Sequence, residues 1–532
     1  MGASLRALRA LVLLAGFYLL GVILLALLAL ADWATFTWLH GPVAGKIVIV
    51  SVVLAVPIVR GMFMLRTPRE DPLPGVPVTE AREPALWRTV RDVADQVGTR
   101  APDEIVLIDE VNAAVAEDAR LLGLRSGTRR LYIGLPLMAG LDEMQLRAVL
   151  AHEMGHYANL DTRLTPLIAR GRAQLIRTIG HFHDRAAGTE AKERARQEKR
   201  AGKRLAKGKK AKEIDTGGAG ITYRTMARIY TAYAEFYMRA TLSSARRQEL
   251  AADLASVRVA GRDSAASALR ELNAIGSAHD FYMSSYATLG VGAGLLPRPG
   301  QVFGGLRQLL DARSAELEDL RRELSTEPAS PYDSHPALAE RVARIEALPD
   351  DGRAGQAARP ALELLSSPQE ALAALEQAVL TPEALALTRL DWEDLVHQAM
   401  TTYAGRTAQE VGEALDAEGA GPGLAAFLDA VDADPAVRWR IADRFPKSEE
   451  AQAATGRTAR EFARPVVRRA LVRLVTVELL ARGAARWQLS WSAPAVLSYP
   501  VPGFEDELGP ALDAAVADQP DTELLRKLVL AP

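Results

Sequence analysis

The chain of 532 residues contains no cysteine, which excludes disulfide scaffolds, thiolate zinc sites, iron–sulfur clusters and cysteine nucleophiles. Any metal site must therefore be built from histidine, aspartate or glutamate, and histidine is scarce, with 8 residues. An excess of charge of either sign is also missing, because 64 Lys and Arg face 66 Asp and Glu, a net charge of -2. This balance gives no reason to expect a nucleic-acid partner.

Apolar residues are concentrated at the N-terminus. Ala10 to Ala31 is a stretch of 22 residues without a charge, long enough at about 1.5 Å per residue to cross a hydrocarbon core of about 30 Å as a helix. A second apolar run, Ile47 to Val59, is shorter, and a buried core helix is its alternative interpretation. We expect residues 1–66 to form two transmembrane helices joined by a short external loop.

The distribution of arginine predicts the orientation of this hairpin in the cell membrane. Positive flanks stay in the cytoplasm, and arginine precedes the first span and surrounds the end of the second. Ala29-Leu30-Ala31 resembles a signal-peptidase site, but the apolar run is longer than the usual core of a signal peptide. The bilayer is thus an expected partner, and the rest of the chain is expected on the cytoplasmic side. The arginines are Arg6, Arg9, Arg60, Arg66 and Arg69.

The chain after residue 66 has mainly helical patterning. Three short apolar segments, Ile105–Ile108, Ala113–Ala116 and Arg130–Ile133, are separated by turn residues and predict a small antiparallel sheet. A Pro-, Gly- and Asp-rich stretch from Pro349 to Pro360 marks a boundary. We therefore expect an α+β domain over 67–348, and a C-terminal α-helical domain over 361–532 whose role cannot be read.

A strongly basic insertion near 189–220 interrupts the α+β region. Residues 190–213 hold 11 Lys or Arg and 4 Glu. The simplest interpretation is a solvated helix or a disordered excursion. The functional alternative is contact with anionic lipid headgroups, because a membrane anchor would already hold this segment near the cytoplasmic leaflet.

The clearest chemical motif is His152-Glu153-Met154-Gly155-His156. It lies within a predicted amphipathic helix, for which Asp142 is the expected N-cap residue and Gln145 occupies the third helical position. Spacing of four residues places both imidazoles on one helical face, where they can bind one ion. Glu153 would lie beside them, close to a water molecule on the metal. The motif predicts hydrolysis that depends on Zn²⁺, one ion per chain.

A catalytic zinc ion needs a third protein ligand. Glu249, on a later periodic helix, is the candidate, and Asp253 follows one turn along the same face. From there Asp253 could accept a hydrogen bond from a ligating imidazole and orient it. The alternative is that Glu249 pairs with Arg246 and that Asp253 is solvated.

At this point the sequence resembles the membrane-associated zinc metallopeptidases of the HtpX and CAAX prenyl endopeptidase family. The resemblance covers roughly residues 74–348. Four motifs in the family's order carry it: His152-Glu153-x-x-His156, Glu249-x-x-x-Asp253 after Arg246-Arg247, Asn112-Ala113, and Ser334-His335-Pro336 followed by Glu340-Arg341.

The resemblance implies a gluzincin-like fold that cleaves peptide bonds, with His152, His156 and Glu249 as zinc ligands. It further implies that Asp253 is the acid behind the ligands and that His335 lies near the substrate cleft. The chain departs from the family between His156 and Glu249, where no run of about 18 apolar residues forms a further membrane segment.

We expect Glu153 to take a proton from water and to return it to the departing amine. His335 is a candidate donor to the oxyanion, and local packing before Pro336 is its alternative role. Asn112, Ala113 and Ala114 could bind an extended peptide by strand addition, unless this segment is involved in ordinary sheet pairing.

Protein or peptide substrates are thus the expected partners, in membrane-protein quality control or in narrow processing. The alternative from another class is an inactive membrane scaffold that uses a degenerate peptidase fold to hold partners. The complete set of three metal ligands favours the enzyme.

Overall fold

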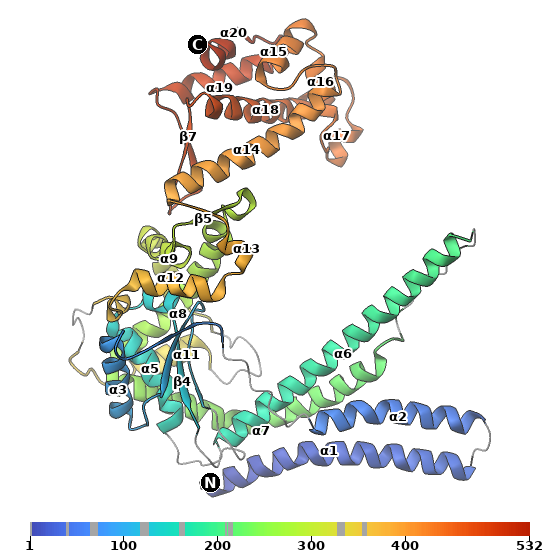
Figure 1. Cartoon of the computed structure of the whole chain (residues 1–532), viewed down its shortest axis with the longest axis vertical. Coiled ribbons are helices and arrows are strands. Elements are labelled where there is room, and N and C mark those ends of the chain that lie inside the picture. Colours follow the sequence, from blue (N-terminus) through green and yellow to red (C-terminus); the bar gives the residue numbers. More distant parts are fainter. Residues whose placement is uncertain are drawn as a thin grey trace. The chain divides into compact units, whose positions relative to one another are not determined.

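The computed structural model describes residues 3–38, 42–63, 73–117, 127–158, 165–207, 210, 216, 218–326, 336–353 and 359–531. It is mainly helical with small sheets (Figure 1). Two compact units are present: one joins Met1–Asn273 with Leu320–Ser366, and the other joins Ala274–Asp319 with Ser367–Pro532. Residues 274–319, which lie within the expected α+β region, therefore belong by contact to the C-terminal unit.

The sheet of the first unit is mixed, so the expectation of an antiparallel sheet is wrong. Strand β1 (Val76–Val78) is antiparallel to β2 (Glu104–Ile108), and β3 (Ala113–Glu117) is antiparallel to β4 (Arg129–Gly134), but β2 and β4 are parallel. The order is β1-β2-β4-β3. Alternating apolar residues predict strands but not their neighbours, and here β4 inserts between β2 and β3.

One helix beside the sheet carries the first metal motif, and a second helix packs on it. Helix α3 (Pro84–Val97) begins with proline in its first turn and buries an apolar stripe of Leu86, Val90, Val93 and Val97. It packs on α5 (Glu143–Ala158), which in turn packs on α7 (Ile221–Ala260). The α5–α7 contact joins parts of the chain that are about ninety residues apart.

The first unit also contains a helical bundle of α1 (Ala3–Trp38), α2 (Pro42–Phe63), α6 (Thr165–Leu205) and α7 (Figure 1). Its core includes Ile58, Leu175, Phe182, Tyr230 and Tyr237, with the half-buried Leu24 and Leu28 of α1 against them. Apolar contact therefore anchors the beginning of α6 beside α1.

One segment within the described residues, Tyr18–Trp38 of α1, is long and apolar enough to cross a membrane. In α2 the apolar part is only Ile47–Val56. This single N-terminal helix suggests membrane association.

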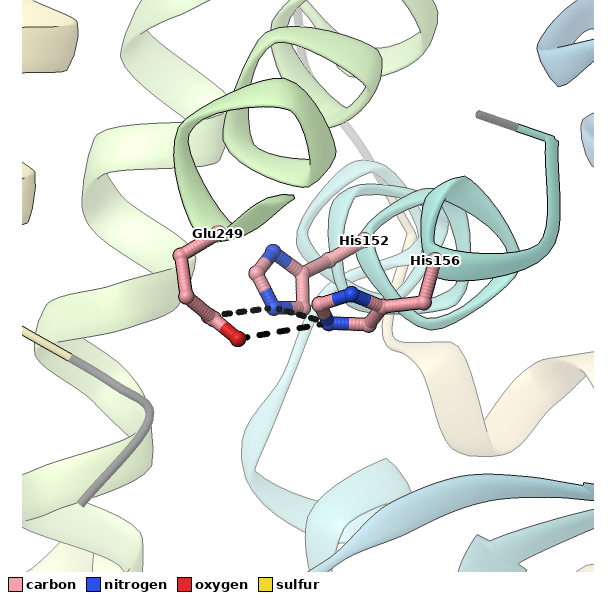
Figure 2. A group of neighbouring side chains, drawn as sticks. All are labelled: His152, His156 and Glu249. Atoms are coloured by element: carbon pink, nitrogen blue, oxygen red, sulfur yellow. Dashed lines mark hydrogen bonds and ion pairs between the residues drawn. The ribbon is translucent and has the colours of Figure 1, made fainter. Parts of the chain in front are cut away.

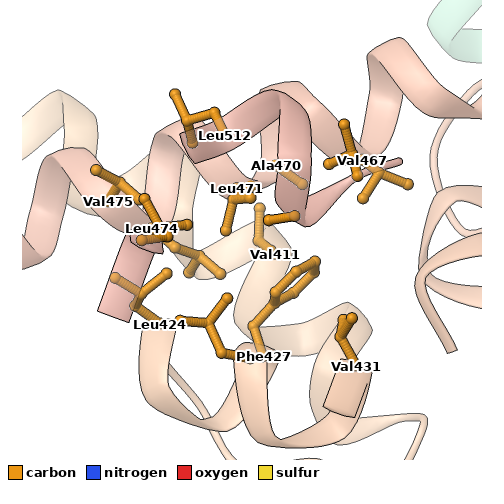
Figure 3. Close-up of a cluster of buried hydrophobic side chains, with 14 of the residues drawn as sticks. Val411, Leu424, Phe427, Val431, Val467, Ala470, Leu471, Leu474, Val475 and Leu512 are labelled. Carbon is orange, nitrogen blue, oxygen red and sulfur yellow. The ribbon is translucent and has the colours of Figure 1, made fainter. Parts of the chain in front are cut away.

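In the C-terminal unit, helices begin at Pro368 and Pro382, and the Thr381 hydroxyl accepts a hydrogen bond from the Ala384 N–H at 3.3 Å. The apolar core lies mainly between α14 (Trp392–Asp416), α15 (Leu424–Ala433), α18 (Gly456–Ala481) and α19 (Phe504–Ala515) (Figure 3).

The other α-helices and strands of the described residues are short, apart from α8. They are α4 (Leu135–Gly140), α8 (Arg262–Tyr282), β5 (Leu295–Pro297), α9 (Gln301–Ala312), α10 (Ser314–Arg322), α11 (Leu338–Glu346), α12 (Pro368–Val379), α13 (Pro382–Leu385), β6 (Thr388–Leu390), α16 (Val437–Asp443), α17 (Glu449–Ala453), β7 (Arg486–Gln488), β8 (Val496–Ser498) and α20 (Glu523–Leu525).

Candidate metal centre

Helix α5 begins with the reciprocal cap that its sequence predicts. The Gln145 backbone N–H donates to the Asp142 Oδ1 at 2.7 Å, and the Asp142 N–H donates to the Gln145 Oε1 at 2.9 Å. Two N–H groups that have no partner within the helix are satisfied in this way. The cap fixes the start of the helix that presents the histidines.

The two imidazoles lie on the same face of α5. Their Nε2 atoms are 3.2 Å apart, and the rings meet edge to face with centroids 4.8 Å apart. His152 is buried, whereas His156 is half-buried. Two ring nitrogens therefore converge on one point at the border between the core and the surface.

Glu249 approaches the same point from α7 (Figure 2). Its Oε2 lies 3.5 Å from the His152 Nε2, and its Oε1 lies 3.7 Å from the His156 Nε2. One ligand atom from each of the three side chains lies within 4.8 Å of the other two. The three residues form a group that could hold a metal ion.

Close packing of α5 on α7 makes this approach possible. A Cβ atom on Gly155 would lie 3.1 Å from the Ala252 Cα and 3.1 Å from the Ala255 Cβ, so only glycine fits without movement. The buried Ser256 hydroxyl of α7 donates to the Ala148 carbonyl of α5 at 2.7 Å. Small residues and one buried hydrogen bond thus bring Glu249 to the histidines.

Asp253 lies behind His152, one helical turn from Glu249. Its Oδ1 is 3.0 Å from the His152 Nδ1, on the side of the ring opposite the Nε2 that faces Glu249. Burial raises the pKa of Asp253, but its hydrogen bonds with His152 and Arg341 outweigh burial and lower the pKa. A charged carboxylate therefore holds one imidazole in orientation.

Arg341 of α11 is a residue of the site whose contact the sequence reasoning missed. It is buried, and its guanidinium donates to Asp253 through Nη2 at 2.6 Å and Nε at 3.1 Å. In the sequence it appears only within the motif that follows His335. Its position on the same face of α11 as Val342 and Ile345, which are buried, was the signal that could have identified it.

Electrostatics at the centre favour a cation. Burial lowers the pKa of His152, but hydrogen bonds to Asp253 and Glu249 outweigh burial and raise the pKa to about 9. The charge of Glu153 acts in the same direction, and that of Arg341 opposes it. Two imidazoles and an acidic surrounding match the nitrogen and oxygen ligands of a divalent transition metal, so the donor set fits.

The other predicted site residues are placed as follows. Glu153 is half-buried on α5. Asn112 is exposed directly before β3, and its carbonyl accepts from the Gly134 N–H at 2.8 Å. Ala113 and Ala114 lie in β3, at the end of the sheet order. His335 lies outside the described residues.

Comparison with known proteins identifies the class that this fold and site define. The family model of peptidase family M48 matches residues 80–348, just over half of the chain. The chain therefore belongs to peptidase family M48, whose members are metallopeptidases. A "Protease HtpX homolog" from Kineococcus radiotolerans (strain ATCC BAA-149 / DSM 14245 / SRS30216) is 26% identical over 273 residues, which cover 51% of this chain and 76% of the relative. No solved structure matches.

Proposed function

We propose that this protein is a zinc-dependent endopeptidase that hydrolyses peptide bonds of protein substrates. The observation that carries the proposal is the convergence of His152, His156 and Glu249 within 4.8 Å. The contact of Asp253 with the far side of the His152 ring supports it, because ligating histidines commonly donate their second N–H to a carboxylate.

Each group of the chain has a separate task in this reaction. Zinc bound by the three ligands would supply Lewis-acid chemistry, acidifying water and polarising a carbonyl. Glu153, next to His152 in the chain, takes the proton of the attacking water and returns it to the departing amine. His335 is our candidate donor to the developing oxyanion. In the segment of Asn112, Ala113 and Ala114, the backbone of Ala113 holds the peptide as an added strand beside β3.

The decisive experiment compares metal content with cleavage. The full chain, purified in detergent and loaded with metal, is expected to hold one zinc ion and to digest an unfolded casein. Glu153→Gln should keep the zinc and lose the cleavage. Glu104→Gln, which removes only an exposed ion pair with Arg130, is the matched control and should retain both. A wild-type chain that takes up no zinc would instead favour a scaffold with a degenerate site.

We also propose that α1 and α2 anchor the protein in the cell membrane as two spans, with the peptidase unit in the cytoplasm. The apolar segment Tyr18–Trp38 and the arginines around the two helices support this arrangement. The natural role could then be quality control of membrane proteins or a narrower processing step. Mapping cleavage sites on a peptide library derived from a whole proteome separates the two, since processing would give one dominant motif.

The basic segment 190–213 is our proposed contact with anionic lipid. Its described part continues α6 beyond the residues packed beside α1, and Lys203, Arg204 and Lys207 are exposed there. Native mass spectrometry of the full chain in detergent should detect bound phosphatidylserine. The count should fall when Lys203, Arg204, Lys207, Lys209 and Lys210 are changed to Gln, whereas bound phosphatidylcholine should not change. If the variant and the wild type bound the same number of phosphatidylserine molecules at low salt, the contact would be rejected, because electrostatic attraction is strongest under that condition.

A further inference from the structure

Strand β3 turns alternate backbone groups toward its partner strand and toward its other edge. In an antiparallel pair, a residue's N–H and C=O point to the same side, and the side alternates along the strand. The Asn112 carbonyl bonds to the Gly134 N–H, so position 112 faces β4. It follows that Ala114 and Ala116 also face β4, whereas Ala113 and Val115 face the opposite edge.

The Val115 carbonyl on that edge is already engaged. The hydroxyl of Tyr157, the residue after the second zinc-ligand candidate His156, donates to the Val115 carbonyl at 2.6 Å. Within an antiparallel ladder, an added strand would place an amide nitrogen about 2.9 Å from this oxygen. The tyrosine hydroxyl therefore lies about as far from the Val115 carbonyl oxygen as the amide nitrogen of an added strand would lie.

A buried arginine holds Tyr157 in this position. The Arg129 guanidinium lies over the Tyr157 ring, 4.8 Å from its centroid. The same guanidinium donates to the Thr99 hydroxyl at 3.1 Å, to the Arg100 carbonyl and to the Glu117 carboxylate at 3.2 Å. Glu117 is the last residue of β3. Arg129 thus connects the ring of Tyr157 with β3, the strand whose Val115 carbonyl accepts the Tyr157 hydrogen bond. The position of Tyr157 is therefore fixed both by this hydrogen bond and by the contact of its ring with Arg129.

We infer that Tyr157 ends the substrate ladder on β3 and so limits how far an extended peptide can pair with the enzyme. This inference rests on the proposed function, because it assumes a peptide that adds to β3. The N–H and C=O of Ala113 face the edge to which the substrate adds, whereas at the next position on the same edge, Val115, the carbonyl is already bonded. A carbonyl oxygen has two lone pairs, so one hydrogen bond by itself would leave room for a second donor. The hydroxyl excludes the further strand because it occupies the space that the strand's amide group would need.

The consequence is a substrate preference based on length rather than on side chains. Residues of the peptide that reach Val115 gain no backbone hydrogen bond to its carbonyl, and longer peptides bind no better on that side. In an antiparallel ladder, the residue opposite Val115 precedes the residue opposite Ala113 in the substrate. The limit should therefore act on extension toward the N-terminus of the peptide.

The test uses Tyr157→Phe, which keeps the ring under Arg129 and removes only the hydroxyl. The substrates are a short casein-derived peptide with one mapped cleavage site and two versions lengthened by three residues, at the N-terminal or at the C-terminal end. For the variant we expect a KM roughly three- to tenfold lower on the peptide lengthened at its N-terminal end, which is the effect of one backbone hydrogen bond, with kcat nearly unchanged. The short peptide should be cleaved as by the wild type, which also shows that the variant is folded.

Tyr403→Phe is the matched control, because its hydroxyl likewise donates to a backbone carbonyl, that of Leu289 at 2.7 Å, in the other unit. It should leave all three KM values unchanged. The inference would be overturned if the KM of each lengthened peptide relative to the short one were the same for wild type and Tyr157→Phe. The same KM change on all three peptides, or a lower KM only on the peptide lengthened at its C-terminal end, would also overturn it. A wild type that cleaves no peptide would contradict the proposed function instead, so the two failures are distinguishable.

Discussion

Arg341 donates two hydrogen bonds to Asp253, from Nη2 to Oδ1 at 2.6 Å and from Nε to Oδ2 at 3.1 Å. The two residues lie 88 positions apart, and both are buried. The same Asp253 Oδ1 lies 3.0 Å from the His152 Nδ1, so one carboxylate joins an arginine to an imidazole. The orientation of the first histidine is therefore set by α11 as well as by its own helix.

Replacement of Arg341 should weaken the metal centre. Arg341→Met leaves the buried Asp253 carboxylate without its cation, so we expect a loss of about 3 kcal/mol in unfolding free energy and roughly tenfold weaker zinc binding. Arg341→Lys should restore part of the stability but less of the zinc affinity, because an ammonium group cannot make both hydrogen bonds. Competition with a chromophoric chelator measures the affinity. Arg344→Met, an exposed partner of Glu340 on the same helix, is the control, and an equal effect there would contradict the prediction.

Gly155→Ala should separate α5 from α7. Its Cβ would meet Ala252 and Ala255 at 3.1 Å, and overpacking of this kind costs roughly 1–3 kcal/mol. We expect a lower melting temperature and weaker zinc binding. Gly188→Ala is the control, because Gly188 lies within α6 and has open space around it. At position 188 alanine should stabilise the helix slightly. The packing argument would be refuted if Gly188→Ala lowered the melting temperature while Gly155→Ala kept that of the wild type.

Removal of metal should lower the thermal stability of the protein. A ligand that binds only the folded state stabilises it by about 2.7 kcal/mol when its concentration is a hundred times its Kd. We expect a strong chelator to lower the melting temperature of the wild type and added zinc to restore it. Glu249→Ala should respond much less to either addition. An equal response of both proteins would show that the stabilising ion binds elsewhere.

Acid should weaken the attachment of α5 to its surroundings. Burial raises the pKa of Glu143, but its ion pairs with Arg359 at 2.8 Å and Arg147 at 3.1 Å outweigh burial and lower it. A lowered pKa in the folded state gives stability that is present above the unfolded value, 4.5, and is lost as the pH falls through the folded value. The melting temperature of Glu143→Gln should thus lie below that of the wild type at pH 7 and approach it near pH 3. A constant difference across this range would contradict the assignment.

The absence of cysteine makes the proposed topology directly testable. Thr37→Cys lies at the end of the apolar part of α1, and Glu110→Cys lies at an exposed position after β2. In intact cells, a membrane-impermeant maleimide should label Thr37→Cys alone. Glu110→Cys should react only after the membrane is permeabilised. Labelling of Glu110→Cys in intact cells would place the peptidase unit on the outer side of the membrane.

Local features of the site could be predicted because they depend on neighbours in the chain. The reciprocal cap of Asp142 and Gln145 and the shared face of His152 and His156 follow from helical spacing alone. The strands β2, β3 and β4 were likewise expected from short apolar segments, but their order was not. Strand order depends on which pairing buries the most apolar surface, and that is a property of the whole unit.

The sequence by itself determined that two imidazoles and a neighbouring carboxylate stand on one helix, because a helix repeats every 3.6 residues whatever surrounds it. It also determined that no thiol takes part. Only the tertiary structure decided that Glu249 reaches the histidines, that Arg341 holds Asp253 and that Tyr157 caps Val115. Contacts between distant parts of the chain depend on the close packing of whole elements, here α5 on α7 through Gly155, and no local pattern encodes that distance.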